Sequence, residues 1–484
     1  MHLNHYLDHM FNAESVAVIG ASNVLGKWGF GIISLLLRNG GRKVYPVNRK
    51  GGDVLGAKAY RSLGEVPGPV DVAVIVTAVK DTPAAMEDCV RKGVKFAIVI
   101  SGGFSEASEE GARVEREVVK IARQGGIRFV GPNCMGHFDT YTDFFTIPFK
   151  NPVRKGPVSI ITQSGNSGIA VFAQGWDMGL GFSKYINSGN EADIHFEDYL
   201  EYLGQDENTG VILGYVEGFR EGKRFLELAG DITKRKPVVI FKAGRTEEGA
   251  RAAQSHSAAL SGSDAVSNAA FRQTGVIRVQ KIGDLVDTAL ALVSQPLPRG
   301  RRVGVISMGG GLGVISTDAL RKLGLEMARL SPETIEKLNS VMSERWSHGN
   351  PVDPGGDPII YPCIWPLLED ENVDAVMVVG GVGMVGGLTA LMPIPDLLKD
   401  DYARFMEKSE REMLADLERM MDMMKRHRKP VIAASMVSGS VVKSRVYEKL
   451  ESNYLLPYPG PERAAKALSR LVEYSEYLGI ARGK

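Results

Sequence analysis

The sequence of 484 residues lacks three features that identify large classes of protein. Its only cysteines, Cys89, Cys134 and Cys363, are widely spaced, which excludes a disulfide scaffold and a CxxC metal site. The 58 basic and 57 acidic side chains nearly cancel, so no basic field points to nucleic acid or to an anionic membrane. Residues 1–11 contain no long apolar run, which argues against a signal peptide or a membrane anchor. We therefore expect a cytoplasmic protein.

Glycine, in contrast, is abundant. It makes up 56 of the 484 residues, about 12%, whereas the average share in proteins is about 7%. The glycines gather in loops that follow a short apolar run and precede a helical pattern. Three such units begin at Val16, Val158 and Val303, so that successive units are about one domain apart. Buried parallel strands read as continuous apolar runs, and glycine permits a tight turn from strand to helix. The sequence therefore predicts an α/β fold of three consecutive doubly wound, Rossmann-like or flavodoxin-like parallel-sheet domains, over residues 1–148, 149–298 and 299–484.

Further apolar runs alternate with helical patterns, as in parallel sheets. We expect strands over 43–47, 70–76, 96–100, 128–130, 211–216, 237–241, 375–379 and 430–434, and helices over 29–37, 82–92, 109–124 and 401–429. In the last helix the residues Met406, Met413, Leu417, Met420 and Met424 fall on one face. Such a stripe is typical of packing rather than of a special site.

The first glycine loop, from Gly20 to Gly29, offers backbone N–H groups and a helix start to an anion such as phosphate. It lacks the G-x-G-x-x-G pattern, and no acidic residue ends the next strand, where NAD-binding domains bind the ribose. That strand ends instead in Asn48-Arg49-Lys50, and the two cations suit a phosphorylated nucleotide. By itself the loop is equally compatible with an ordinary tight turn.

Four segments of this domain resemble the CoA-binding domain of succinyl-CoA synthetase and of its ADP-forming acyl-CoA synthetase relatives. They are residues 12–22, 45–48, 101–106 and 131–136. The resemblance implies that CoA lies across the domain with its thiol end toward Asn133 and Cys134. Cys134 is not expected to be a nucleophile, because no histidine motif accompanies it as in cysteine hydrolases. The CoA-binding residues implied are Gly20, Ser22, Asn23, Gly26, Lys27, Asn48, Lys50, Thr77, Asn133 and Cys134.

One histidine in the second domain has surroundings that suit phosphoryl chemistry. His256 lies in a stretch of small and hydroxyl-bearing residues, 255–264, which offers room and donors to a phosphohistidine. The Ser-Gly-Asn-Ser-Gly loop at 164–168 suits a dianion, and Glu217 follows a strand, where α/β active sites gather. The other histidines are interpreted as structural or exposed, and no metal site is expected: His2, His5, His9, His137, His195, His348 and His427.

These positions are similar, residue by residue, to the active-histidine loop, the phosphate-binding loop and the histidine-orienting glutamate of the same family. The resemblance implies that His256 carries a phosphoryl group and that Glu217 orients it. The phosphate-binding residues implied are Thr162, Ser164, Gly165 and Asn166. The segments 188–193 and 241–245 also match, and the first of them implies Gly189 and Asn190 as acyl-substrate residues.

The reaction implied converts acyl-CoA, phosphate and ADP into the acid, CoA and ATP, through an acyl phosphate and a phosphohistidine. Neither a Walker A motif nor an ATP-grasp-like segment is present in the sequence. The resemblance therefore implies an α subunit that works with an ATP-grasp-type β subunit, in an α₂β₂ assembly, with ATP or ADP and Mg²⁺ on the partner. The substrate class is a small carboxylic acid or its acyl-CoA, and no motif identifies the acid or decides between ADP and GDP.

The third domain departs most from the family pattern. Residues 350–354, 461–465 and, loosely, 309–313 match it, whereas residues 380–387 and 401–429 do not. Two alternatives are considered. A CoA-binding regulatory or acyltransferase-associated protein of the same fold would not need His256, Glu217 and Ser164. A dinucleotide-binding dehydrogenase would need the missing G-x-G-x-x-G pattern and ribose acid.

Overall fold

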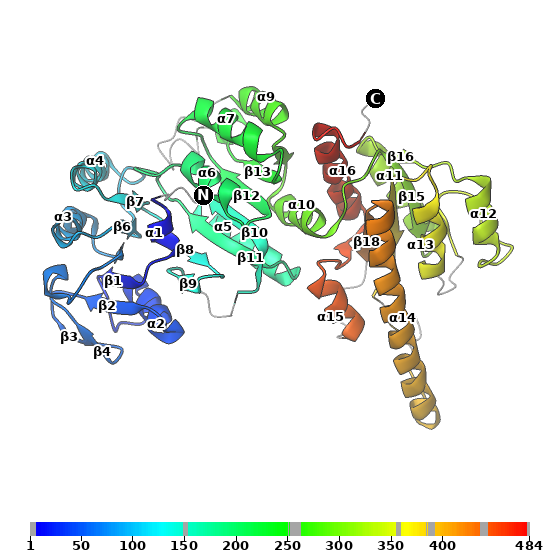
Figure 1. Cartoon of the computed structure of the whole chain (residues 1–484), viewed down its shortest axis with the longest axis horizontal. Helices are drawn as coiled ribbons and strands as arrows, with labels where there is room; N and C mark the ends of the chain where they lie inside the picture. Colours follow the sequence, from blue (N-terminus) through cyan, green and yellow to red (C-terminus); the bar gives the residue numbers. More distant parts are fainter. Residues whose placement is uncertain are drawn as a thin grey trace. The chain divides into compact units, whose positions relative to one another are not determined.

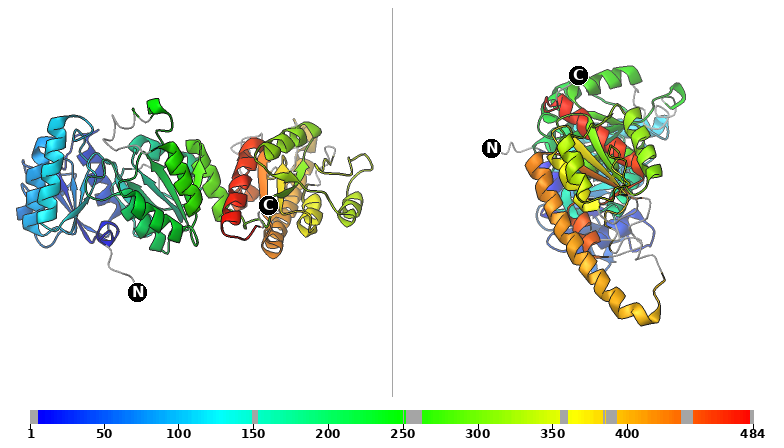
Figure 2. Two further views of the ribbon diagram at one scale, coloured as in Figure 1. Left: turned by 90° about the horizontal axis from the view of Figure 1, so that it is seen from above. Right: turned by 90° about the vertical axis from the view of Figure 1, so that its right-hand side faces the viewer.

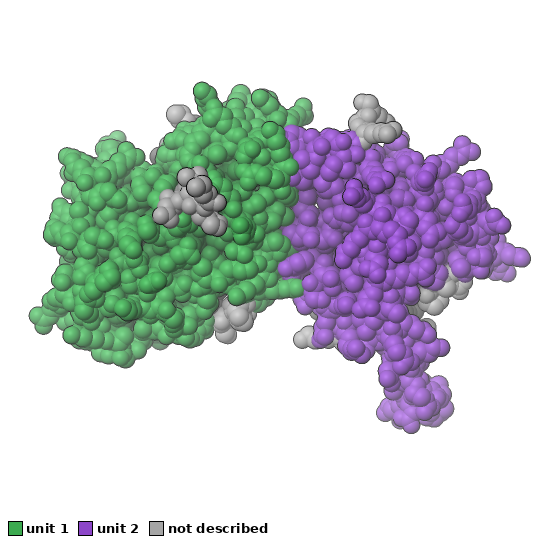
Figure 3. Space-filling model, viewed as in Figure 1, with its two compact units in different colours: residues 1–176, 180–282 green, residues 177–179, 283–484 purple. Residues whose placement is uncertain are grey.

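The computed structural model describes residues 6–148, 153–249, 251, 263–354, 360–383, 385, 393–435 and 444–481. The chain folds into two compact units (Figure 3). The first consists of residues 1–176 and 180–282 and holds two of the large sheets. The second consists of residues 177–179 and 283–484 and holds the third large sheet.

The first sheet is fully parallel and has the strand order β2-β1-β5-β6-β7. Figure 1 shows this domain in blue, with helices α3 and α4 labelled. Alternate strand residues face two apolar cores, one shared with helices α3 and α4 and the other with α1 and α2. The elements are α1 Asp8–Phe11, β1 Ser15–Ile19, α2 Trp28–Asn39, β2 Lys43–Val47, β3 Gly52–Val54, β4 Ala57–Ala59, η1 Leu63–Glu65, β5 Val72–Ile75, η2 Val79–Asp81, α3 Thr82–Lys92, β6 Phe96–Val99, α4 Glu109–Gln124 and β7 Arg128–Val130.

The second sheet has the order β14-β13-β12-β10-β11-β8-β9. Its strands are parallel except for β8 and β9, which pair antiparallel at the β11 edge. The elements are β8 Gly136–Asp139, β9 Phe144–Phe145, β10 Lys155–Thr162, α5 Gly165–Asp177, β11 Phe182–Asn187, α6 Phe196–Gln205, β12 Val211–Val216, α7 Gly222–Ile232, β13 Val238–Lys242, α9 Asp264–Thr274 and β14 Ile277–Val279. One apolar cluster contains residues of both sheets, which explains why the two form a single unit.

The second unit is built on a parallel sheet of order β16-β15-β17-β18-β19. Its elements are α10 Ile282–Ser294, β15 Arg302–Ser307, α11 Gly310–Lys322, β16 Glu326–Met327, α12 Pro332–Asn339, α13 Ile360–Glu369, β17 Ala375–Val379, η4 Asp396–Leu398, α14 Lys399–His427, β18 Val431–Ser435, α15 Arg445–Ser452, β19 Tyr458–Pro459 and α16 Pro461–Tyr477. Helix α14 packs its second half through Leu417, Met420 and Met424, and its first half extends away from the sheet (Figure 2).

The three large sheets, parallel except for β8 and β9 at one edge of the second, confirm the predicted fold class. The domain limits at 148 and 298 stay predictions, and strands β8 and β9 pair with the second sheet although their residues precede 148. In the described part of the chain, we find no helix with the length and apolar character needed to cross a membrane.

Candidate functional site

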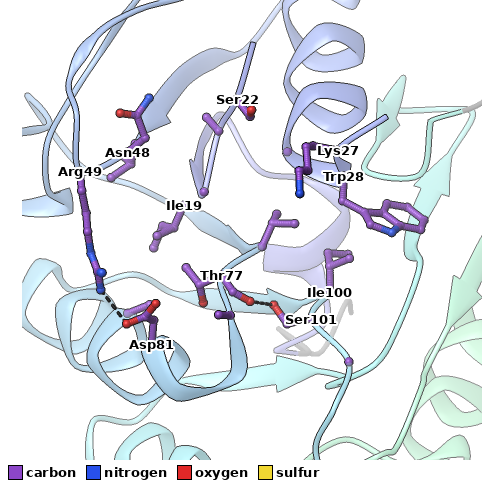
Figure 4. A pocket seen from close by; sticks show the side chains of 18 of the residues that line it. Ile19, Ser22, Lys27, Trp28, Asn48, Arg49, Thr77, Asp81, Ile100 and Ser101 are labelled. Atoms are coloured by element: carbon purple, nitrogen blue, oxygen red, sulfur yellow. Dashed lines mark hydrogen bonds and ion pairs between the residues drawn. The ribbon is translucent and has the colours of Figure 1, made fainter. Parts of the chain in front are cut away.

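A cavity of about 1180 Å³ opens at the carboxyl ends of the strands of the first sheet (Figure 4). Strand β2 lies on one side of β1, and β5, the next strand of this sheet along the chain, lies on the other side. The direction of winding therefore reverses between β1 and β5. In doubly wound sheets, ligands bind outside the carboxyl ends of the strands at this reversal. The loops that follow β1, β2, β5 and β6 line the cavity through residues that include Gly20, Asn48, Thr77 and Ser101.

Glycine is required at two places in the first loop because backbone approaches backbone there. Gly20 has φ +101°, and a Cβ on it would lie 2.5 Å from the carbonyl oxygen of Val76. A Cβ on Gly29 would lie 2.1 Å from the carbonyl oxygen of Gly20. The start of α2 is therefore held against the loop, and its first N–H groups lie at the cavity, where they suit an anion.

Asparagine side chains hold the rim of the cavity in place. Asn23 donates from Nδ2 to the carbonyl oxygen of Asp53 and accepts at Oδ1 from the N–H of Leu55, both at 2.9 Å. Asn48 accepts at Oδ1 from the N–H groups of Lys50 and Gly51, also at 2.9 Å. These contacts fix the turn that presents the lysine.

Four cations, Lys27, Arg49, Lys50 and Arg61, line the cavity, and of these only Arg49 has an ion pair among the described residues. Arg49 pairs with Asp81 at 2.8 Å, as drawn in Figure 4. Lys27 and Lys50 are exposed and occur in none of the ion pairs of the described chain. Their charges are therefore available to phosphate groups of a ligand.

The far end of the same cavity is lined by loops of both sheets. Asn133, Cys134 and Met135 come from the loop after β7, and Ser164, Gly165 and Asn166 come from the start of α5. The Cys134 thiol donates to the carbonyl oxygen of Val99 at 3.3 Å, and burial raises its pKa to about 12. At neutral pH this group is a thiol, not the thiolate that nucleophilic attack requires.

The second sheet also reverses its winding, between β10 and β12, and one glutamine spans the reversal. Gln163 follows β10, and its Oε1 accepts from the N–H groups of Glu217 and Gly218 at 2.6 and 3.2 Å. Its Nε2 donates to the carbonyl oxygen of Gly218 at 2.8 Å. From the next strand, the buried Lys242 donates to the carbonyl oxygen of Glu217 at 2.6 Å. The main chain of Glu217 is therefore held from two sides.

The structure brings most of the predicted residues into one cavity. Those that line it are Gly20, Ser22, Asn23, Lys27, Asn48, Lys50, Thr77, Asn133, Cys134, Ser164, Gly165 and Asn166. Gly26, Thr162, Glu217, Gly189 and Asn190 are not among its lining residues. The Asn190 side chain instead donates to Glu106 and Glu115 of the first domain, at 2.6 and 2.9 Å. His256 lies outside the described residues.

The lining residues that were not predicted from the sequence include Met135, Gln163 and Asn187. Asn187 accepts from the N–H of Met135 at 2.6 Å and donates to the carbonyl oxygen of Thr162 at 2.9 Å, so it ties the two loops together. Gln163 directly follows β10 and Asn187 ends β11, each directly before a Ser-Gly pair, and this position was the available signal. Among the residues the structure describes, no group of three or more His, Cys, Asp or Glu side chains could hold a metal ion.

Sequence comparison assigns both halves of this site to known families. Residues 14–138 match the "CoA binding domain" family and residues 155–292 the "Succinyl-CoA ligase like flavodoxin domain" family. The chain is 37% identical to the α subunit of acetate–CoA ligase (ADP-forming) II of Pyrococcus furiosus, over 98% of this chain and 99% of that protein. The chain belongs to the α subunits of the ADP-forming acyl-CoA synthetases. The predicted family is thereby confirmed.

Two further relatives cover nearly the whole α subunit as well. The α subunit of the corresponding ligase I of Pyrococcus furiosus is 38% identical, with 97% of this chain and 98% of that one aligned. A solved structure of acetyl-coenzyme A synthetase 1 from Ca. Korarchaeum cryptofilum, in complex with phosphate and ADP, superimposes with a TM-score of 0.83 at 32% identity. It covers 98% of each chain. All three large sheets of this chain therefore lie within the length that these relatives share.

Proposed function

We propose that this α subunit, together with a partner subunit, interconverts acyl-CoA, phosphate and ADP with the free acid, CoA and ATP. The observation that carries the proposal is the shared cavity, because the CoA loop of the first sheet and the Ser-Gly loop of the second line one space. Such a space lets a thioester and a phosphate ion meet. The relatives from Pyrococcus furiosus are acetate–CoA ligases, so acetate or another small carboxylic acid is the proposed substrate class.

CoA is proposed to bind along the first sheet. Its phosphate groups would be held by N–H groups of the Gly20–Gly29 loop and by Lys27 and Lys50, which have no ion pair of their own among the described residues. Its thiol end would reach Asn133 and Cys134, at the end of the cavity where the Ser-Gly loop begins. Gly26 and Thr77 complete the proposed CoA set with Ser22, Asn23 and Asn48.

The chemistry proposed runs in three displacements. A phosphate oxygen attacks the thioester carbonyl carbon, and the C–S bond breaks to release CoA, leaving an acyl phosphate. A nitrogen of His256 then attacks the phosphorus, and the carboxylate leaves. The P–N bond finally breaks when an oxygen of ADP takes the phosphoryl group. Dividing one difficult transfer in this way is the general advantage of nucleophilic catalysis.

The second domain is proposed to hold the phosphoryl group through these steps. Ser164, Gly165 and Asn166 would bind its oxygens at the start of α5, where the helix dipole favours an anion. Thr162 shapes the turn, because its hydroxyl donates to the carbonyl oxygen of Ser164 at 2.6 Å. Glu217 would orient the His256 imidazole and stabilise the cation formed on phosphorylation. Gly189 and Asn190 would lie beside the acyl group.

The nucleotide is proposed to bind elsewhere. The chain has no Walker A motif, so we infer a β subunit of the ATP-grasp type that holds ADP or ATP with Mg²⁺, in an α₂β₂ assembly. The α-subunit names of the relatives support a partner of some kind. A regulatory CoA-binding protein without turnover is not favoured, since the Ser-Gly loop and Glu217 would serve no purpose in it.

The proposal is tested by labelling of the protein. The α subunit, with the subunit that co-purifies from its native source, is incubated with acetyl-CoA and radiolabelled phosphate. We expect acid-labile, base-stable label on the α chain, lost in His256→Ala and retained in the control variant His427→Ala. In Ser164→Ala the label should form about 10²–10³ times more slowly, the usual effect of losing one donor to a developing charge. Label that persists in His256→Ala would show that another residue is the carrier.

A further inference from the structure

A buried glutamate contacts the side chain of Gln163, the residue directly before the proposed phosphate-binding loop at 164–166. The proposed chemistry does not use this glutamate. Glu191 follows β11 in the loop 188–191, with only 3% of its surface exposed. Its Oε2 accepts from Nε2 of Gln163 at 3.0 Å, and its Oε1 lies 2.8 Å from the hydroxyl of Ser188. No ion pair involving Glu191 occurs among the described residues, and its backbone has the uncommon φ of +55°.

The hydrogen bonds around Ser188 indicate which protonation state fits. The Ser188 hydroxyl lies within hydrogen-bond distance of two acceptors, Oε1 of Glu191 at 2.8 Å and the carbonyl oxygen of Thr162 at 3.3 Å. A hydroxyl has one hydrogen to donate, and when Glu191 itself donates to the Ser188 oxygen, that hydrogen is left for the Thr162 carbonyl oxygen, which also accepts from the N–H of Ser188 at 2.9 Å. That donation requires the neutral carboxylic acid.

The electrostatic surroundings favour the same state. Burial, with the nearby carboxylate of Glu197 on α6, raises the pKa of Glu191 to about 8, and the hydrogen bonds with Ser188 and Gln163 and the Arg220 guanidinium oppose that rise only in part. Arg220 is engaged with the carbonyl oxygen of Asn190 at 3.0 Å. The hydroxyl of Tyr199, also on α6, has its own pKa raised by burial and by Glu191, so it stays neutral.

We infer that Glu191, in its neutral form, is a positioning residue that holds the Gln163 amide and through it the main chain of Glu217 and Gly218 beside the phosphate loop. This inference rests on the proposed function, since it concerns the placement of the groups that would hold the phosphoryl oxygens and the histidine. The link runs from Glu191 to Gln163 and from Gln163 to the N–H groups of Glu217 and Gly218. An ionised Glu191 would place an unpaired negative charge next to this network and would oppose a bound phosphate.

Two variants of the full α subunit, assayed with its partner beside wild type, separate this role from a structural one. Glu191→Gln keeps an acceptor for Gln163 and a donor for Ser188 but cannot ionise. We expect wild-type activity at pH 7, and above pH 8 we expect wild type to lose on the order of tenfold in kcat/KM for phosphate while Glu191→Gln does not. Glu197→Gln is the matched control: without the neighbouring carboxylate the pKa of Glu191 should fall, so the alkaline loss should begin at a lower pH.

Two outcomes would overturn the inference. If Glu191→Gln is inactive at pH 7, whether folded or unfolded, the neutral form does not support the site. If Glu191→Gln shows the same alkaline loss as wild type, another group is responsible for it. Thermal unfolding of the α subunit alone provides an independent readout. Because the folded pKa lies above that of an unfolded glutamate, wild type should lose stability as pH rises from 5 to 8, and Glu191→Gln should lose less.

A failure of the proposed function would give a different result. Wild type would then show no phosphate-dependent turnover at any pH, while the pH dependence of thermal unfolding would still differ between wild type and Glu191→Gln. Equal pH dependence of unfolding in these two proteins would count against Glu191 even if the enzyme is active.

Discussion

Particular glycines in the first loop are required because the backbone approaches itself closely there, and no sequence pattern indicates such an approach. The sequence predicted a glycine-rich turn from 20 to 29 but could not say which of its glycines is indispensable. The structure does so, because a Cβ on Gly20 or Gly29 would meet a backbone carbonyl oxygen, whereas a Cβ on Gly26 would meet no atom within 4 Å and glycine is favoured there only by its φ of +81°. The loop therefore owes its shape to close backbone packing at Gly20 and Gly29 and not to its overall glycine content.

This difference gives a prediction for CoA binding. Gly29→Ala should push the start of α2 away from the loop, weaken CoA binding about tenfold and lower the free energy of unfolding by about 1–3 kcal/mol, the usual cost of forcing an extra group into a packed site. The matched control is Gly222→Ala, at the start of α7, where a Cβ meets no atom within 4 Å. Calorimetric titration with CoA measures both proteins. Unchanged CoA affinity in Gly29→Ala would contradict the close approach.

At the scale of elements, helix α16 is fixed to α10 by an ion pair within the second unit. Arg463 donates from Nε and an NH₂ group to the two oxygens of Asp287, at 2.8 and 2.6 Å. Asp287 is 4% exposed, and burial raises its pKa while the Arg463 guanidinium opposes the rise. The segment 461–465 matched the family pattern, but the sequence did not show what this segment does. The structure supplies one, since Arg463 anchors the helix that this segment begins.

Removing the arginine should therefore destabilise the second unit. Loss of one partner of a buried pair typically costs about 3–5 kcal/mol, and because the Arg463 side chain is 35% exposed we expect about 2–3 kcal/mol for Arg463→Ala. The pKa of Asp287 should rise further in this variant, so the loss should be largest at neutral pH and smaller in acid. Chemical unfolding at pH 5 and 7 measures it. Arg404→Ala, which removes an exposed pair on α14, should change nothing measurable.

Most individual elements could be predicted because their signals are local. Strands β2, β7 and β12 and helices α3 and α4 have the bounds that the apolar runs and helical patterns indicate. Helix α14 begins and ends two residues earlier than predicted, within the usual uncertainty of helix ends. Strand β8 could not be placed in the same way, because its antiparallel pairing with β11 depends on residues more than forty positions away. An apolar run in the sequence indicates that a strand exists, but it does not indicate which sheet the strand joins.

The same limit applies to the candidate site at the scale of the molecule. The loops that follow β1, β2, β7 and β10 could be assigned to CoA and phosphate from their motifs. That they line one cavity could not, because it depends on the apolar core shared by the two sheets. Asn187 and Gln163 were missed for a related reason: their role is to tie neighbouring loops together, and it becomes visible only when both loops are in place.

The α subunit is expected to need a partner subunit for ATP-dependent turnover. Two of the relatives are α subunits by name, and the sequence contains no Walker A motif, so the isolated chain should form no acetyl-CoA from acetate, CoA and ATP. It should nevertheless bind CoA, because the lining residues of the first sheet all belong to this chain. Adding the subunit that co-purifies from the native source should restore ATP-dependent turnover, and light scattering of the complex should give two copies of each chain. ATP-dependent synthesis by the α subunit alone, free of any other protein, would show that the nucleotide site lies within these 484 residues.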